Sequence, residues 1–310
     1  MAAKLGYLLP TRERVMEGLG ETGPLLDLAR RAEALGFDSL WIGDSVTARP
    51  RHDPLTLMAA VAVAAPRLHI GTAVLLPALR NPVLLAHQVA TIDRLTEGKL
   101  ILGVGIATDI ANIRAEFAAC GVPFDKRVGT MMEGLRLCRA LWSGKPVDWD
   151  GRWPLAGMTV GPTPHRAGGP PIWGVGASPA ALARIGRHFD GWFPNDAEPA
   201  EYAERLSRIR VEAKAAGRDP AAIAGAAYLT LAIDDDKARA EARMDDFMAR
   251  YYGQPAAVMR ARQRNFAGPA TAATEWLASY VAAGAQHICL RFAGDPVPQM
   301  EAIGKARGAL

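Results

Sequence analysis

Two short apolar runs stand out in the first third of the chain, Leu68–Val74 and Lys99–Val104. Neither shows the alternation of polar and apolar residues that a half-exposed strand needs, so both are predicted to be strands buried on two faces. Between them, Asn81 and the proline that follows supply a helix N-cap and first helical position, and apolar residues recur at helical spacing until Gly98. A strand, a helix and a strand in this order predict two parallel neighbours.

The alternation of strand-length and helix-length segments continues along the chain. The other predicted strands are about Lys4–Leu9, Ser39–Ile42, Ile172–Val175, Gly191–Phe193, Ala226–Ala232 and His287–Phe292. The other predicted helices are about Pro24–Leu35, Pro54–Ala65, Ile110–Trp142 with a break near Gly121, Pro179–Phe189, Pro199–Ala216, Asp236–Tyr251 and Thr271–Ala283. Eight βα units with right-handed crossovers predict an α/β fold, the (β/α)8 TIM barrel. An open doubly wound sheet is the alternative, disfavoured because no G-x-G-x-x-G motif follows the first strand.

One segment departs from this alternation. Pro146–Thr163 carries an Asp-Gly turn between aromatic-rich arms, which predicts an inserted hairpin. We therefore expect a single domain over residues 1–310, with an insertion at about 146–168 and a variable region at about 196–266.

Composition and charge exclude several classes of protein. Half of the residues are hydrophobic and 22% are charged, as in an ordinary globular chain. The net charge of +4 comes from scattered Lys and Arg, so no nucleic-acid partner is expected. No apolar run reaches the roughly 18–20 residues of a membrane span, and the N-terminus lacks a signal-peptide layout. Cys120, Cys138 and Cys289 lack metal-ligand spacing, and free thiols predict a cytoplasmic location.

The amino-acid sequence of several segments resembles that of the bacterial-luciferase-like oxidoreductases. The most specific motifs are GTAVLLP from Gly71, RNPVLLAHQ from Arg80 and GKLILGVG from Gly98. Further segments similar to the family are Gly6–Glu13, Ala32–Ser45, Glu116–Gly144, Pro170–Pro194 and Gly284–Phe292. Their order and spacing carry the resemblance over most of the chain.

The resemblance implies a monooxygenase that uses reduced FMN and oxygen on a small organic substrate, with the FMN supplied by a separate flavin reductase. It also implies a homodimer. The alternative is hydride transfer by the deazaflavin coenzyme F420. A second alternative is a flavin-binding relative that has lost catalysis, because Ser45 stands where many relatives have histidine.

A candidate anion site lies between a predicted strand and a helix start. Gly174, Gly176, Ala177 and Ser178 form a glycine-containing turn whose N–H groups and helix dipole favour an anion. From these residues alone, Ser178 and the following proline either bind an anion or only begin a helix. The resemblance implies that the turn binds the cofactor phosphate.

The other candidate residues follow the ends of the second, third and fourth strands, where a barrel enzyme carries its chemistry. Asp44 and His52 are the candidate catalytic residues; His52 could equally be a solvated loop histidine. The resemblance implies a non-prolyl cis peptide at Ala73–Val74, which supports the cofactor ring, and Gly105 follows the fourth strand. We predict that Asp44 and the Ala73–Val74 bond lie side by side, with Asp44 accepting a hydrogen bond from the cofactor or His52.

Arginines and aromatic residues give two open interpretations. Three arginines either bind an anionic substrate or are solvated surface groups: Arg49, Arg51 and Arg80. The aromatic residues Trp149, Trp153, Tyr251 and Tyr252 either line a substrate site or pack in the interior or at an interface.

Overall fold

The computed structural model describes residues 3–309, which form two compact units. The first unit comprises residues 3–10, Asp27–Trp41 and 173–309. The second comprises Thr11–Leu26 and Ile42–Ile172.

All eight predicted strands are present, within one or two residues of the predicted ends. They are β1 (Lys4–Leu8), β2 (Ser39–Ile42), β3 (His69–Thr72), β4 (Leu100–Val104), β7 (Ile172–Gly174), β8 (Gly191–Trp192), β9 (Ala224–Ile233) and β11 (His287–Phe292). Their hydrogen-bonded order is β9-β11-β1-β2-β3-β4-β7-β8, and β8 also pairs with β9. An order that returns to its first strand is that of a (β/α)8 barrel, so the predicted fold class is confirmed.

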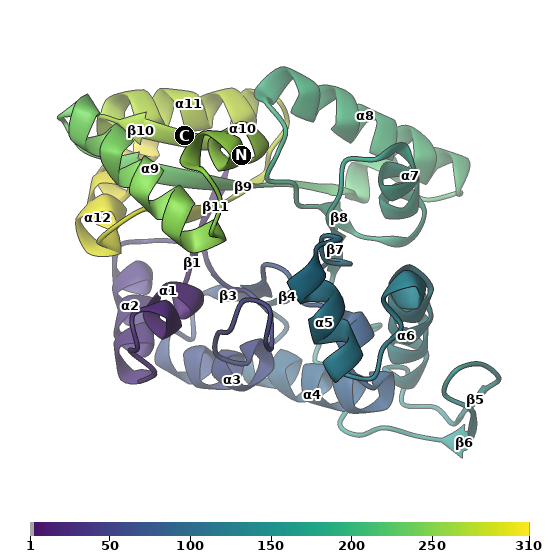
Figure 1. Cartoon of the computed structure of the whole chain (residues 1–310). Helices are drawn as coiled ribbons and strands as arrows, with labels where there is room; N and C mark the ends of the chain where they lie inside the picture. Colours follow the sequence, from purple (N-terminus) through teal and green to yellow (C-terminus); the bar gives the residue numbers. More distant parts are fainter. Residues whose placement is uncertain (1–2, 310) are drawn as a thin grey trace. The chain divides into compact units, whose positions relative to one another are not determined.

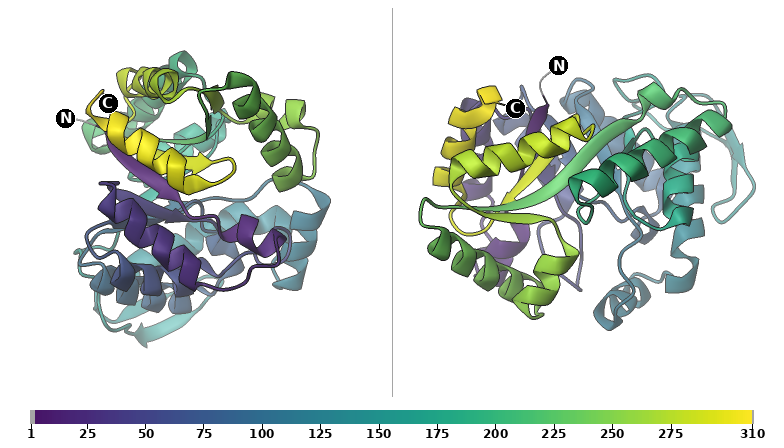
Figure 2. Two further views of the ribbon diagram at one scale, coloured as in Figure 1. Left: turned by 90° about the vertical axis from the view of Figure 1, so that its left-hand side faces the viewer. Right: turned by 90° about the horizontal axis from the view of Figure 1, so that it is seen from above.

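In the first unit, β11 lies between β1 and β9 and is parallel to both. All six residues of β11 are buried, including the polar His287 and Arg291, as in a strand covered on two faces. Figure 2 shows β9, in green, as a long strand, and its ten residues reach far enough to pair with an additional strand, β10 (Asn265–Gly268).

Seven helices, labelled in Figure 1, belong wholly or mostly to the first unit. They are α2 (Gly23–Ala34), α7 (Pro179–His188), α8 (Pro199–Ala215), α9 (Lys237–Tyr252), α10 (Ala256–Arg262), α11 (Ala270–Ala282) and α12 (Pro296–Ala306). Short 3₁₀ turns follow α8 and α12, at Pro220–Ala222 and Arg307–Ala309. The sequence analysis did not include α10, β10 or α12, and α10 and β10 are short segments of seven and four residues.

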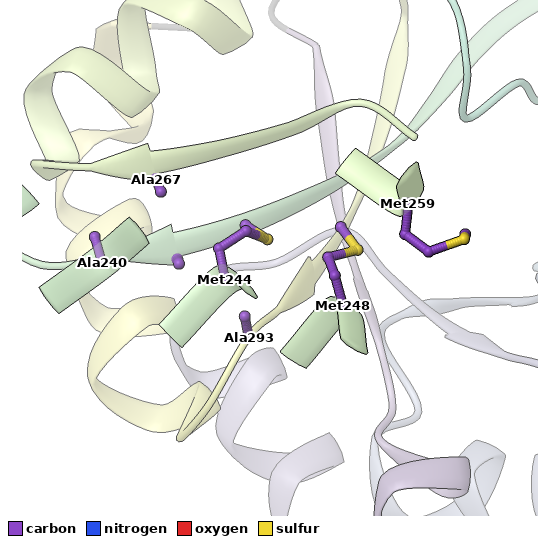
Figure 3. Packing of buried hydrophobic residues seen from close by; sticks show 7 residues of the cluster. Ala240, Met244, Met248, Met259, Ala267 and Ala293 are labelled. Atoms are coloured by element: carbon purple, nitrogen blue, oxygen red, sulfur yellow. The ribbon is translucent and has the colours of Figure 1, made fainter. Parts of the chain in front are cut away.

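A methionine-rich cluster joins α9 and α10 to the strand ends of the first unit. Met244, Met248 and Met259 pack with small alanines, among them Ala267 of β10 and Ala293 just after β11. Figure 3 shows Met244 and Met248 near Ala267 and Ala293, with Met259 at one edge of the group. Methionine side chains are flexible and fill irregular gaps, so this core can adjust to small displacements of α9 and α10.

The second unit holds β3, β4 and the helices before, between and after them. Its helices are α1 (Thr11–Met16), α3 (Pro54–Ala64), α4 (Pro82–Leu95), α5 (Ala111–Ala119) and α6 (Arg127–Leu141), with 3₁₀ turns at Pro77–Leu79 and Phe124–Lys126. The predicted caps are confirmed, since Asp53 accepts the N–H of Thr56 and Asn81 accepts that of Val83. The predicted hairpin is also present, as antiparallel β5 (Val147–Trp149) and β6 (Leu155–Met158).

The three cysteines are free thiols, as predicted. Cys138 and Cys289 are buried, and burial raises the pKa of Cys138 to about 12. Among the described residues, no helix is both long and apolar enough to cross a membrane.

Candidate functional site

The second unit brings the ends of β2, β3 and β4 together by backbone hydrogen bonds. The Ala73–Val74 peptide is cis, as the resemblance implied. The Ala73 N–H donates to the Ile42 carbonyl (2.8 Å), and the Gly105 N–H donates to the Leu75 carbonyl (2.9 Å). Three of the predicted site positions, Ala73, Val74 and Gly105, are therefore neighbours at the carboxyl ends of adjacent strands.

Asp44 lies beside the cis peptide, as predicted, but its partner is an arginine. Its carboxylate accepts the N–H of Leu76 (2.9 Å), two residues after Val74. Both terminal nitrogens of Arg80 donate to it as well, at 2.5 and 3.0 Å, in a two-pronged ion pair. The Asp44 side chain is 1% exposed and that of Arg80 is 15% exposed, so this is a buried pair.

Arg80 also connects Asp44 with the cap of α3. Its second terminal nitrogen lies 3.2 Å from the Asp53 carboxylate. Burial would raise the pKa of Asp53, but the hydrogen bonds from Thr56 and the charge of Arg80 outweigh it and lower that pKa. Of the two interpretations of Arg80, neither describes it fully, because the guanidinium already has two carboxylates of its own.

Of the two hydrogen-bond donors predicted for Asp44, the cofactor or His52, the structure contradicts His52. His52 Nε2 lies 2.8 Å from the carbonyl oxygen of Gly20. A carbonyl only accepts, so Nε2 carries a proton, and in the neutral form of the ring Nδ1 has the lone pair. Nδ1 is buried and has no hydrogen-bond partner within residues 3–309. His52 is thus held in one tautomer by a loop 32 residues away, a contact that no local pattern reveals.

A buried glutamate that the sequence analysis missed shapes the loop after β2. One carboxylate oxygen of Glu116, on α5, accepts the Ser45 hydroxyl (2.7 Å) and the N–H groups of Val46, Thr47 and Ala48. Its second oxygen is buried and has no hydrogen-bond partner in the described chain. The only available signal was a charged residue at an inward position of an otherwise weakly patterned helix.

Ser45, at the position where many relatives have histidine, serves the same loop. Its hydroxyl donates to Glu116 and accepts the N–H of Arg49 at 2.9 Å. Both hydrogen-bonding directions of this hydroxyl are therefore used for structure. Next to it, a side chain at Gly43 would collide with the guanidinium of Arg51, which lies across the end of β2.

In the first unit, the predicted turn before α7 has the features of an anion site. Ser178 caps the helix by accepting the Ala181 N–H (3.3 Å). Gly176 has φ +130° and carries a close approach to Ala181 that a side chain would block. Within residues 3–309, the N–H groups of Gly176, Ala177 and Ser178 have no protein acceptor.

Contacts to other atoms of the turn fix its position without using those N–H groups. The Trp192 indole donates to the Gly176 carbonyl (3.0 Å), and Gly174 lies so close to Phe189 that a side chain would not fit. Three free N–H groups, a hydroxyl and a helix N-terminus suit a phosphate group, so the residues present fit the ribityl phosphate of either flavin-type cofactor.

Comparison with known proteins gives the family. A family model described as luciferase-like monooxygenase matches residues 3–301. The chain belongs to this family. One relative of this luciferase-like protein is a phthiodiolone/phenolphthiodiolone dimycocerosates ketoreductase from Mycobacterium sp. (strain JLS), 30% identical over 274 residues, which cover 78% of this chain and 71% of that protein.

Two further relatives of this luciferase-like protein are named for F420. An F420-dependent glucose-6-phosphate dehydrogenase from Mycolicibacterium smegmatis is 33% identical over 221 residues, 68% of this chain and 65% of that protein. The solved structure of an F420-dependent secondary alcohol dehydrogenase with an F420-acetone adduct aligns with a TM-score of 0.85 and 20% identity, over 100% of this chain and 99% of that one. The structural match supports the barrel fold alone.

Proposed function

We propose that this luciferase-like protein is an F420-dependent oxidoreductase that transfers hydride between the coenzyme and a small carbonyl or alcohol substrate. The observation that carries the proposal is the phosphate-ready turn at Gly176–Ser178, in a chain whose strand ends carry the family's cis peptide. The choice of F420 over FMN rests on the names of two relatives, one an F420-dependent dehydrogenase and one a ketoreductase.

The proposed roles follow from the contacts of each residue. When bound, the deazaflavin supplies a ring carbon that gives or takes hydride. The Gly176–Ser178 N–H groups and the Ser178 hydroxyl bind the phosphate, and Ala73 and Val74 support the ring. The Asp44 carboxylate already accepts three hydrogen bonds, two from Arg80 and one from the Leu76 N–H, so we assign it the role of positioning the end of β3.

His52 is the residue we propose for proton transfer. Carbonyl reduction requires a proton at the product oxygen, and an imidazole can give or accept one. The Gly20 carbonyl orients the His52 ring and leaves Nδ1 as the atom that takes or gives the proton.

An FMN-dependent monooxygenase is the second candidate. The hydroxyl of Ser45 is fully engaged in the loop, so the position where relatives carry histidine offers no acid here. Oxygen chemistry of reduced FMN depends more on exclusion of water than on such an acid. In this case a separate flavin reductase would be a partner. For either cofactor we propose a small-molecule substrate, a homodimer and a cytoplasmic location.

Anaerobic and aerobic turnover with the purified protein distinguish the two candidates. We expect oxidation of reduced F420 by a panel of small ketones without oxygen, and no substrate oxygenation with reduced FMN in air. His52→Gln should lower kcat by about 10²-fold or more, as loss of a general acid does, with coenzyme affinity unchanged. Oxygenated product with FMN and no F420 turnover would replace the proposal by its alternative.

A further inference from the structure

Arg291 is a buried cation whose neighbours are all neutral. It lies near the carboxyl end of β11, on the same face as His287 and Cys289, and is 2% exposed. Its guanidinium donates to the hydroxyls of Thr230 and Tyr252, at 2.9 Å each, and to the side-chain carbonyl of Gln263 at 3.1 Å. None of these acceptors carries a charge.

Four aromatic rings surround the same guanidinium. Its central carbon lies 4.7–5.5 Å from the ring centres of Tyr228, Phe247, Tyr251 and Tyr252. Ring faces attract a cation, but they do not neutralise it. Burial raises the pKa of Tyr228 and of Cys289 well above their ordinary values, so neither supplies a negative charge at neutral pH.

The missing negative charge is unusual for the first unit. Arg243 and Arg260, on α9 and α10, are both paired with carboxylates although they are more exposed. Arg291 has no carboxylate within 4 Å among residues 3–309. Burying a cation without a counter-charge is strongly unfavourable, and buried charges in proteins are normally paired.

The hydrogen-bond inventory of Arg291 is also incomplete. A guanidinium has five N–H donors, and four hydrogen bonds are made: two to Thr230, one to Tyr252 and one to Gln263. The terminal nitrogen that binds Tyr252 retains one N–H without an acceptor. The same nitrogen donates to the Tyr252 hydroxyl, and both Tyr252 and Gln263 are partly exposed.

We propose that Arg291 binds an oxyanion, a carboxylate or phosphate group of a small-molecule ligand. An oxyanion takes the remaining N–H and supplies the missing charge. The Tyr252 hydroxyl donates to the side-chain carbonyl of Gln263 (2.7 Å), so the donor that these two partly exposed residues can add to the same group is the amide NH₂ of Gln263. That the ligand is the enzyme's substrate rests on the proposed function; the binding site itself does not.

The aromatic side chains of α9 next to Arg291 can adjust to a ligand. Tyr252 and Phe247 of α9 pack against the methionine cluster of Figure 3, which includes Met248 and Met259. Unbranched methionine side chains repack at low cost, so Tyr252 can shift outward without opening a rigid core.

Thermal unfolding of the cofactor-free protein tests the site without any turnover. The melting temperature is measured in sodium acetate, sodium phosphate and sodium chloride at equal ionic strength and pH 7. With acetate or phosphate at about tenfold excess over Kd, we expect the wild type to melt about 2–4 °C higher than in chloride. Arg291→Met should lose this difference. Arg239→Met, at a side chain that is 67% exposed, is the matched control and should keep it.

Two further variants separate this site from the turn before α7 and from a structural role. Ser178→Ala should retain the acetate effect, whereas a phosphate effect lost in Ser178→Ala but kept in Arg291→Met would place phosphate at the turn and overturn the phosphate part of the proposal. Arg291→Lys keeps the charge without the two-pronged geometry, and calorimetric titration should show about tenfold weaker acetate binding.

The proposal fails if the wild type melts equally in acetate and chloride, or if Arg291→Met keeps the difference. If Arg291→Met does not fold, equal acetate affinity of Arg291→Lys and the wild type overturns it. Failure of the F420 turnover assay with a positive binding result would reject the proposed function and leave this site in place.

Discussion

Asp44 in the second unit and Arg291 in the first are both buried charges near the carboxyl ends of barrel strands, yet their surroundings are opposite. Asp44 faces a two-pronged arginine and a backbone N–H. Arg291 faces hydroxyls, an amide and ring faces. The first charge is neutralised inside the chain, and the second is not.

The difference indicates two uses of a buried charge. A charge that is paired within the protein fixes the geometry of the segments that carry it, because breaking the pair is costly. A charge without a partner costs stability in the free protein and gains it back when a ligand supplies the opposite sign. The same strand ends of one fold therefore hold a positioning pair and a binding residue.

Removing the partner of Asp44 is the most severe test of this contrast. Arg80→Leu leaves the Asp44 carboxylate buried and unpaired, so we expect the free energy of unfolding to fall by about 3–5 kcal/mol in urea denaturation. Arg114→Leu removes an arginine whose ion pair with Asp109 lies at the surface and whose side chain is 46% exposed, so it should change stability much less. Equal losses for the two variants would mean that the Asp44 pair is not a positioning pair.

Glu116 sharpens the contrast, because it is a buried carboxylate whose partners are mainly backbone N–H groups. Glu116→Ala leaves those donors and the Ser45 hydroxyl without an acceptor, although Val46 and Thr47 are exposed and regain water. We expect a loss of about 2–3 kcal/mol by the same measurement. Glu204→Ala, at an exposed position of α8, is the control and should change stability little.

The smallest expected effect concerns an anion site built without any charged side chain. Ser178→Ala should weaken cofactor binding by about 0.5–1.5 kcal/mol, the net contribution of one hydrogen bond, in a fluorescence titration. Ser143→Ala, which also removes a hydroxyl near a helix end, should leave the affinity unchanged. An unaltered affinity of the Ser178 variant would exclude the hydroxyl from phosphate binding.

The parts of the molecule that sequence could predict depend on short-range patterns. Apolar runs of strand length located β2 and β11 with their observed ends, and Asn-Pro located the start of α4. The Ser178 cap and the hairpin also follow from neighbouring residues. The cis peptide at Ala73–Val74 followed from resemblance, since no pattern of side chains distinguishes it from an ordinary strand end.

The parts that could not be predicted depend on contacts between distant residues. Arg80 lies 36 residues from Asp44, Glu116 lies 71 from Ser45, and Thr230 lies 61 from Arg291. A charged residue on a helix reads as solvated until its partner is known. His52 shows the converse error, because its nearness in sequence to Asp44 suggested a bond that its contact with Gly20 replaces.

The two hydrogen bonds of the Ser45 hydroxyl limit which residues can replace it in a redesigned protein. Its small hydroxyl satisfies Glu116 and the Arg49 N–H from a site that is 6% exposed. An imidazole at this position is larger than the hydroxyl and cannot, from one atom, both donate to Glu116 and accept the Arg49 N–H. The family's usual histidine cannot therefore be grafted here as a single exchange, and any such remodelling has to rebuild positions 45 and 116 as one unit.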